Sequence, residues 1–203
     1  KALHEEHHKL ARLACENSAV LLKNEDGILP VGAKVQAAVI GDFAFDPRYQ
    51  GAGSSMVNST KVDSIKDMLK TSGISVTGIV RGYQRDGKED ETMKKEAVDL
   101  ARRSDVVLFF FGLNEKSETE GLDRKHLRIP QNQINLIQEL AKANANMIGI
   151  ISAGSVIEMP WHHHFKALLH TALMGQAGAG AVLDILSGKV NPSGKLAETY
   201  IKK

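Results

Sequence analysis

The densest group of side chains that could transfer protons lies between Ser117 and Arg124, in the order Ser-Glu-Thr-Glu-Gly-Leu-Asp-Arg. A general acid needs a carboxyl group whose pKa is raised by burial or by a neighbouring negative charge. Gly121 would let the backbone approach a substrate. Asp123 and Arg124 could anchor the loop or contact ligand hydroxyls. The segment is a candidate site for acid–base chemistry, and a solvated charged loop is an equally good interpretation.

Two glycine-containing segments, Gly51–Ser55 and Gly175–Gly180, could bind an anion through backbone N–H groups. The first lacks the third glycine of the dinucleotide fingerprint and the GK[ST] ending of a P-loop. An acidic residue about 20 positions past a complete GxGxxG is also missing. We therefore favour tight turns and close helix–sheet packing as the role of these glycines. A non-catalytic module that binds a nucleotide or phosphate stays open as an alternative.

Two histidine clusters match patterns of metal sites. His4–His8 fits HExxH, but a third ligand is not recognisable downstream, and a helix end does not supply the walled cavity of a catalytic zinc. We expect a solvated helix there. His162–His164 are adjacent, so their side chains point in different directions, and we expect them at the surface. The sequence thus predicts neither a metal nor a cofactor.

The elements that must position these segments follow from the periodicity of apolar residues. Helical patterns span Lys1–Asn24, Val62–Thr71, Glu91–Arg103, Gln131–Ala143 and Ala179–Leu186. Short apolar runs expected as strands are Val35–Gly41, Ile74–Val80, Asp105–Gly112, Asn146–Ser152 and Ala167–Ala172. This alternation predicts an α/β fold, namely a three-layer sandwich whose mostly parallel sheet of five to six strands has helices on both faces.

Folds of this class carry their chemistry in loops beyond the carboxyl ends of the strands. Three loops qualify: Asp42–Asn58, Leu113–Pro130 and Ala153–Trp161. The first two are much longer than the ~2–6 residues usual for such connections. Long loops on a rigid sheet are where function tends to lie.

Composition narrows the class of protein. The 203 residues, 42% hydrophobic and 25% charged, predict one domain over residues 1–203. A net charge of +2 does not support nucleic-acid binding. No apolar stretch approaches the ~20 residues of a membrane span. The single cysteine, Cys15, does not require an oxidising compartment, which favours the cytoplasm. The missing initiator methionine suggests a piece of a longer parent, whose signal peptide would not be visible here.

Taken in order, several segments resemble the C-terminal α/β-sandwich domain of glycoside hydrolase family 3, a family of β-glucosidases, β-xylosidases and β-N-acetylglucosaminidases. The matching segments are Ser18–Asn24, Gly27–Pro30, Ala38–Gly41, Gly51–Ser55, Glu120–Arg124, Leu127–Pro130 with Gln133, Gly175–Gly178 and Asn191–Leu196. Each segment is weak by itself, whereas the ordered set covers nearly the whole chain.

The resemblance implies a retaining glycosidase, most simply a β-glucosidase that removes terminal non-reducing β-D-glucosyl residues. Its nucleophile is an aspartate on a preceding (β/α)8 barrel, and its acid/base is a glutamate at the position of Glu120. Glu118 is the second candidate for that role, because loop length varies in this region. Ser54 and Ser55 would line the sugar pocket. The two carboxyl groups must come within about 5–5.5 Å of one another for retention.

The resemblance also implies that this chain holds half an active site, since the barrel is absent from it. We expect it to be inactive alone, with Glu120 exposed to solvent and without the partner carboxylate that would raise its pKa. The expected partners are the barrel and a β-linked glucoside or oligosaccharide. The barrel-facing surface should be apolar, so self-association is also expected. A purely structural domain that docks on a barrel is a further alternative.

Overall fold

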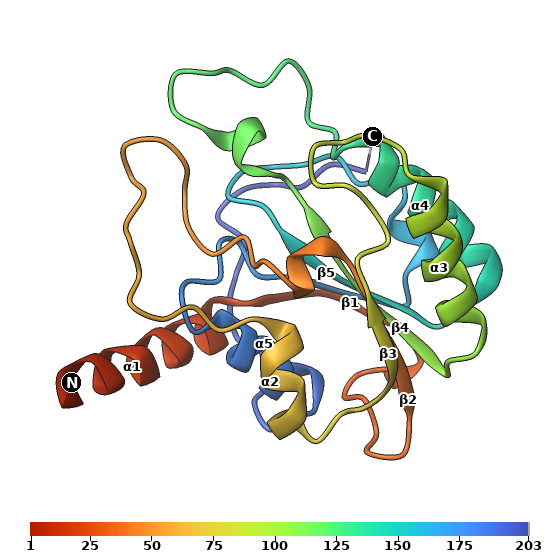
Figure 1. Ribbon diagram of the computed structural model, residues 1–203, viewed down its shortest axis with the longest axis horizontal. Coiled ribbons are helices and arrows are strands. Elements are labelled where there is room, and N and C mark those ends of the chain that lie inside the picture. The colour runs from red at the N-terminus through yellow and green to blue at the C-terminus, as the bar shows by residue number, and fades with distance from the viewer. Residues whose placement is uncertain (203) are drawn as a thin grey trace.

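One six-stranded sheet organises the molecule, in the order β1-β6-β5-β4-β2-β3 (Figure 1). The computed structural model describes residues 1–202. The strands are β1 (Val20–Asn24), β2 (Gln36–Ile40), β3 (Ser75–Val80), β4 (Val106–Gly112), β5 (Met147–Ser152) and β6 (Ala167–His170). Strands β2 to β6 are parallel, and β1 joins β6 as an antiparallel edge strand. The expected mostly parallel sheet is confirmed.

Helices cover both faces of this sheet, which confirms the three-layer arrangement (Figure 1). The α-helices are α1 (Ala2–Ser18), α2 (Ile65–Ser72), α3 (Glu91–Arg102), α4 (Gln131–Ala143) and α5 (Gly178–Leu186). Helices α1 and α2 pack against α5 on one face, and α3 packs against α4 on the other. The core accordingly consists of two apolar clusters, one under each helical layer. Short 3₁₀ helices are η1 (Glu25–Gly27), η2 (Asp42–Ala44), η3 (Glu115–Glu118) and η4 (His162–His164).

The helix expected over Lys1–Asn24 is wrong in its last quarter. Helix α1 ends at Ser18, and the chain continues as strand β1. Leu21 packs with the apolar cluster on one face of the sheet and Leu22 with the cluster on the other, which is the two-residue period of a strand. The strand ends at Asn24, whose side-chain amide bonds both the N–H and the carbonyl of Leu29.

Strand β4 is one of the two central strands that support the loops. All seven of its residues are buried, as its unbroken apolar sequence predicts for a strand covered on both faces. Below the loops, Phe111 stacks on Phe109 at 4.8 Å between ring centroids and on Phe165 at 5.5 Å. Trp161 meets the ring of Phe111 edge-on at 5.0 Å. This aromatic packing gives the carboxyl end of β4 a rigid base.

Strands β2 and β4 are neighbours, and after each of them the chain turns to a different face of the sheet. After β2 the chain runs to α2, on the same face as α5, and after β4 it runs to α4, on the other face. In open α/β sheets such a switch point separates the two following loops and leaves a crevice for ligands. The loops at this point are the two long ones singled out above.

Among residues 1–202, the helices are too short or too polar for any of them to cross a membrane.

Candidate active site

The three loops expected to carry function meet above the carboxyl ends of β2, β4 and β5. A parallel β-bridge joins Ala52, in the loop after β2, to Thr119, in the loop after β4. The residues on either side of this bridge are thereby placed together. Two predicted site segments, around Ser54 and around Glu120, are in direct contact as a result.

Glu120 has an exposed side chain held by a single neighbour. Its Oε2 accepts hydrogen bonds from the Ser54 hydroxyl and, at 2.9 Å, from the Ser54 backbone N–H. These bonds favour the ionised carboxylate and lower the pKa of Glu120 below its usual value. As it stands in this chain, Glu120 is therefore stabilised as the carboxylate.

The glycine at position 53 makes this contact possible. Gly53 has a φ of +92°, and a Cβ there would lie 3.0 Å from the Cβ of Glu120. A larger residue would therefore push the glutamate away from Ser54. Ser55 is also exposed, but its hydroxyl lies against Gly51 and not against Glu120. Of the two predicted sugar-binding serines, the structure brings only Ser54 to the glutamate.

Glu118, the second candidate for the acid/base, has quite different surroundings. Its side chain is only 9% exposed. One oxygen accepts the hydroxyl of Ser155 at 2.6 Å, and the other accepts the N–H of Gly154 at 3.1 Å and Nη2 of Arg48 at 3.4 Å. Arg48 itself is 1% exposed. The sequence pattern does not distinguish the two glutamates, but in the structure Glu118 is largely buried and Glu120 is exposed.

Asp123 and Arg124, in the same loop, also differ in their exposure. Asp123 is exposed, whereas Arg124 is half-buried and donates from Nη2 to the carbonyl of Val156 at 2.7 Å. Arg124 therefore fastens the loop after β4 to the loop after β5. Beneath this fastening is a cavity of about 400 Å³. It is lined by Arg48, Gly51, Ser117, Glu118, Thr119, Leu122, Asp123, Arg124, Gly154, Ser155 and Leu173.

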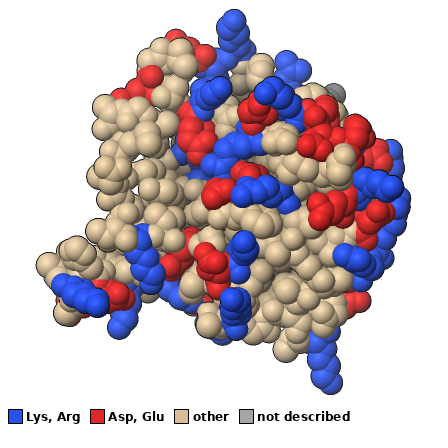
Figure 2. Space-filling model, in the orientation of Figure 1, with Lys and Arg blue, Asp and Glu red and all other residues tan. Residues whose placement is uncertain are grey.

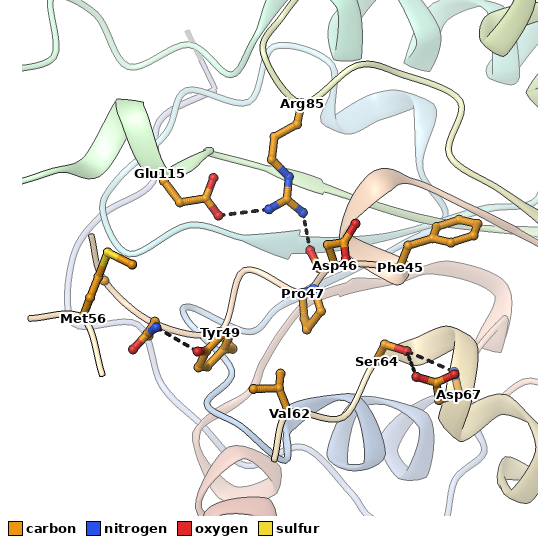
Figure 3. Close-up of a pocket in the computed structure, with 12 residues that line it drawn as sticks. Phe45, Asp46, Pro47, Tyr49, Met56, Val62, Ser64, Asp67, Arg85 and Glu115 are labelled. Carbon is orange, nitrogen blue, oxygen red and sulfur yellow. Dashed lines mark hydrogen bonds and ion pairs between the residues drawn. The ribbon is translucent and has the colours of Figure 1, made fainter. Parts of the chain in front are cut away.

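A second cavity, of about 470 Å³, also has Gly51 in its lining (Figure 3). Its apolar wall includes Tyr49 and Met56. Among its charged groups, Arg85 pairs with Glu115 at 3.0 Å. Part of its lining, including Tyr49 and Met56, comes from the loop Asp42–Asn58 that the sequence predicts to carry function. The cavity itself is not predictable from the sequence, because its other residues come from separate segments that form no motif.

The interpretation of His4–His8 as a solvated helix is wrong for His8. That side chain is buried, with Nε2 bonded to Oδ2 of Asp63 at 2.7 Å and Nδ1 to the side chain of Gln176 at 3.0 Å. His4 is exposed. Of His162–His164, the middle residue is exposed and its neighbours are half-buried. Within residues 1–202, His, Cys, Asp and Glu form no group of three that could hold a metal ion.

Comparison with known proteins agrees with this architecture. Residues 19–203 match the glycosyl hydrolase family 3 C-terminal domain. The chain is 45% identical to thermostable β-glucosidase B of Acetivibrio thermocellus over 198 residues, 96% of the chain and 26% of that protein. It is 43% identical to the exo-α-(1→6)-L-arabinopyranosidase of Bifidobacterium breve over 204 residues, 95% of the chain and 27% of that protein.

A solved structure has the same fold. The crystal structure of the Bifidobacterium adolescentis GH3 β-glucosidase superposes with a TM-score of 0.91 and 45% identity, covering 96% of this chain and 29% of that one. The chain thus spans about a quarter of the length of the curated relatives named above. By sequence and by fold, it belongs to glycoside hydrolase family 3, as the C-terminal domain of that family.

Proposed function

We propose that this chain supplies the general acid/base, Glu120, to a retaining β-glycosidase whose nucleophile is an aspartate on a separate (β/α)8 barrel. The observation that carries the proposal is the exposure of Glu120 beside Ser54, at the switch point between β2 and β4. Glu118 is the weaker candidate, because both of its oxygens already accept hydrogen bonds from groups within the domain.

In the first step, Glu120 would protonate the leaving oxygen while the aspartate attacks the anomeric carbon. In the second, its carboxylate would take a proton from the water that hydrolyses the glycosyl-enzyme. An ionised aspartate within about 5–5.5 Å would raise the pKa of Glu120 and so prepare it as an acid. Once the aspartate is esterified its charge is lost, the pKa of Glu120 falls, and the group can act as a base.

The substrate we propose is a terminal non-reducing β-D-glucosyl residue of a glucoside or oligosaccharide, with Ser54 and Ser55 in contact with the sugar. The β-glucosidases among the relatives support this choice. The two arabinopyranosidases, 43% identical to the chain, make an α-L-arabinopyranoside the substrate to compare.

The surface around the loops supports docking of a barrel. Large apolar side chains are exposed there, with Met56 62% and Leu122 65% accessible, and on α1 Leu10 is 62% accessible. Figure 2 shows charged side chains gathered over the α3 and α4 side, while the loop after β2 forms a largely uncharged margin. Residues 49–60 carry no charge. An apolar surface of this kind is what a removed partner domain exposes, and it would also drive self-association.

The contact between Ser54 and Glu120 weighs against a phosphate-binding role for Gly51–Ser55. The Ser54 N–H, which would face an anion, already donates to the Glu120 carboxylate. A phosphate would meet that negative charge at close range. A purely structural docking domain differs from our proposal only in making Glu120 dispensable, so kinetics of a Glu120 variant separates the two.

The proposal is tested in the intact polypeptide that joins this chain to the barrel, with aryl β-glucosides of graded leaving-group acidity and an aryl α-L-arabinopyranoside. Glu120→Ala should lower kcat/KM about 10²–10⁴-fold for a phenyl leaving group. The loss should be far smaller for a dinitrophenyl group, which leaves without protonation. Glu115→Gln is the control, because Glu115 is a half-buried carboxylate in the same loop that pairs with Arg85 and does not bond Glu120. Full activity of Glu120→Ala on every substrate would leave only a structural role.

A further inference from the structure

The buried carboxylate of Glu118 connects all three loops above the sheet. Its own residue ends η3, in the loop after β4. Arg48 comes from the loop after β2, and Gly154 and Ser155 from the loop after β5. Glu118 and Arg48 are both almost wholly removed from solvent, so removing either would leave the other charge buried without its partner. The three loops are therefore held by one ionic contact and two hydrogen bonds to a single side chain.

The loop after β5, which contains Ser155, lies in turn against Tyr200, and Tyr200 contacts His170 at the end of β6. The hydroxyl of Tyr200 lies 3.5 Å from the carbonyl of Ser155 and 2.6 Å from Nε2 of His170. Nδ1 of His170 accepts the N–H of Ala172 at 3.2 Å, so the neutral ring carries its proton on Nε2 and donates it to Tyr200. Burial lowers the pKa of His170 to about 4, which keeps the ring neutral at neutral pH. The Tyr200 hydroxyl thus lies against the loop that contains Ser155.

Glu118 and Glu120 are close in the chain, so fixing the backbone at Glu118 also restricts the position of Glu120. Only Thr119 lies between them, and it is paired with Ala52 by the β-bridge. Beyond Glu120 the support is weaker. Gly121 has a φ of +79°, a Cβ on it would meet open space within the described part of the chain, and Leu122 is 65% exposed. The position of Glu120 beside Ser54 therefore depends on the Glu118 side of the loop.

We propose that Glu118 is a positioning residue, which through Arg48, Gly154 and Ser155 fixes the loop after β4 so that Glu120 stays beside Ser54. Glu118 does not itself exchange a proton with substrate, because its two oxygens are directed at donors inside the domain. The catalytic consequence of this placement rests on the proposed function of Glu120, whereas the placement itself is a property of this chain alone.

The placement is tested by NMR titration of the ¹³C-labelled Glu120 carboxyl group in this chain. In the wild type the pKa of Glu120 should lie below its usual value. Glu118→Ala should raise it to the usual value, because the contact with Ser54 is lost. Ser155→Ala, which leaves the ion pair with Arg48 in place, should raise it by less, and it serves if Glu118→Ala fails to fold. Glu115→Gln, also in η3, should change nothing. Wild-type titration in both Glu118→Ala and Ser155→Ala would overturn the proposal.

The catalytic consequence is tested in the intact polypeptide with the barrel. Glu118→Ala should lower kcat for a phenyl glucoside about 10–100-fold, with little change in KM, as expected for a misplaced catalytic group. Added azide should not restore it. Restoration by azide, with formation of a glucosyl azide, would show that Glu118 is itself the acid/base and would overturn the proposal. If instead Glu120→Ala retained full activity, the proposed function would fail, while the titration would still decide the placement.

Discussion

Glu118 and Glu120 are two residues apart, yet one is held by three donors and the other faces solvent beside a single serine. A carboxylate surrounded by fixed donors is stabilised as an anion and is well suited to hold loops together. A carboxylate at the surface can change its protonation when a second charged group approaches. The surroundings of Glu118 therefore suit a group that holds loops together, and those of Glu120 suit the proton transfer that we propose for it.

The contact between Ser54 and Glu120 predicts a specific pH dependence. The pKa of Glu120 is lowered in the folded chain by these hydrogen bonds. The resulting stabilisation is present above the ordinary glutamate pKa and is lost as the pH falls through the lowered, folded value. Ser54→Ala removes the hydroxyl bond but keeps the backbone N–H bond, so it should raise the pKa of Glu120 part of the way towards its usual value and remove part of this contribution at neutral pH. NMR titration and urea unfolding at several pH values measure both effects.

Ser55→Ala is the control for this experiment, because Ser55 is exposed in the same loop and does not bond Glu120. An unchanged Glu120 titration in Ser54→Ala, or an equal change in Ser55→Ala, would contradict the assigned contact.

At this scale the sequence alone was only partly informative. Glu120 and Ser54 were identified through a family resemblance, and their contact, across 66 positions, was implied only by the rule that loops of adjacent parallel strands share one edge. Glu118 and Glu120 could not be separated, because burial depends on residues from other loops. The sequence does not single out Arg48 or Ser155, because a lone arginine and a lone serine form no motif.

Helix α1 is fastened to the rest of the domain by a buried polar contact that its sequence does not reveal. The pattern His4–His8 matches a metal-binding helix, but His8 lies against Asp63, just before α2, and Gln176, just before α5. Asp63 is 55 positions away, so only the packing of α1 and α2 against α5 shows the pairing. The pattern therefore has a structural role and not a catalytic one.

His8→Ala should destabilise the domain by about 1–3 kcal/mol, because it leaves the buried Asp63 carboxylate without that partner. His7→Ala, an exposed change on the same helix, should stay within about 0.5 kcal/mol of wild type. Urea unfolding of the two variants measures the difference. Equal midpoints for both variants would show that the contact contributes nothing to stability.

The elements themselves were largely predictable, with one informative failure. The central strands and α3 to α5 have strong periodicity and lie within one or two residues of their expected positions. Strand β1 was assigned to the preceding helix because Leu21 and Leu22 satisfy the helical period as well as the strand period. The segment forms a strand and not a helix because the edge of β6 offers hydrogen bonds that only an extended segment can use.

As a whole, the molecule leaves its candidate site open to solvent. Its crevice lies between diverging loops, its candidate acid/base faces outward, and apolar side chains flank it. A retaining mechanism needs a second carboxylate about 5–5.5 Å from Glu120. Within the described residues, the groups that bond Glu120 come from Ser54 alone. In the function that we propose, a docked barrel would supply the second carboxylate.

The most direct test is chemical rescue of Glu120→Ala in the intact polypeptide by azide. With the acid/base removed, an activated aryl β-glucoside should still form the glycosyl-enzyme, which then accumulates because no base activates water. Azide, which needs no base, should restore turnover and yield β-glucosyl azide, identified by NMR. Glucose as the only product, at a rate that azide does not change, would contradict the assignment of Glu120 as the acid/base.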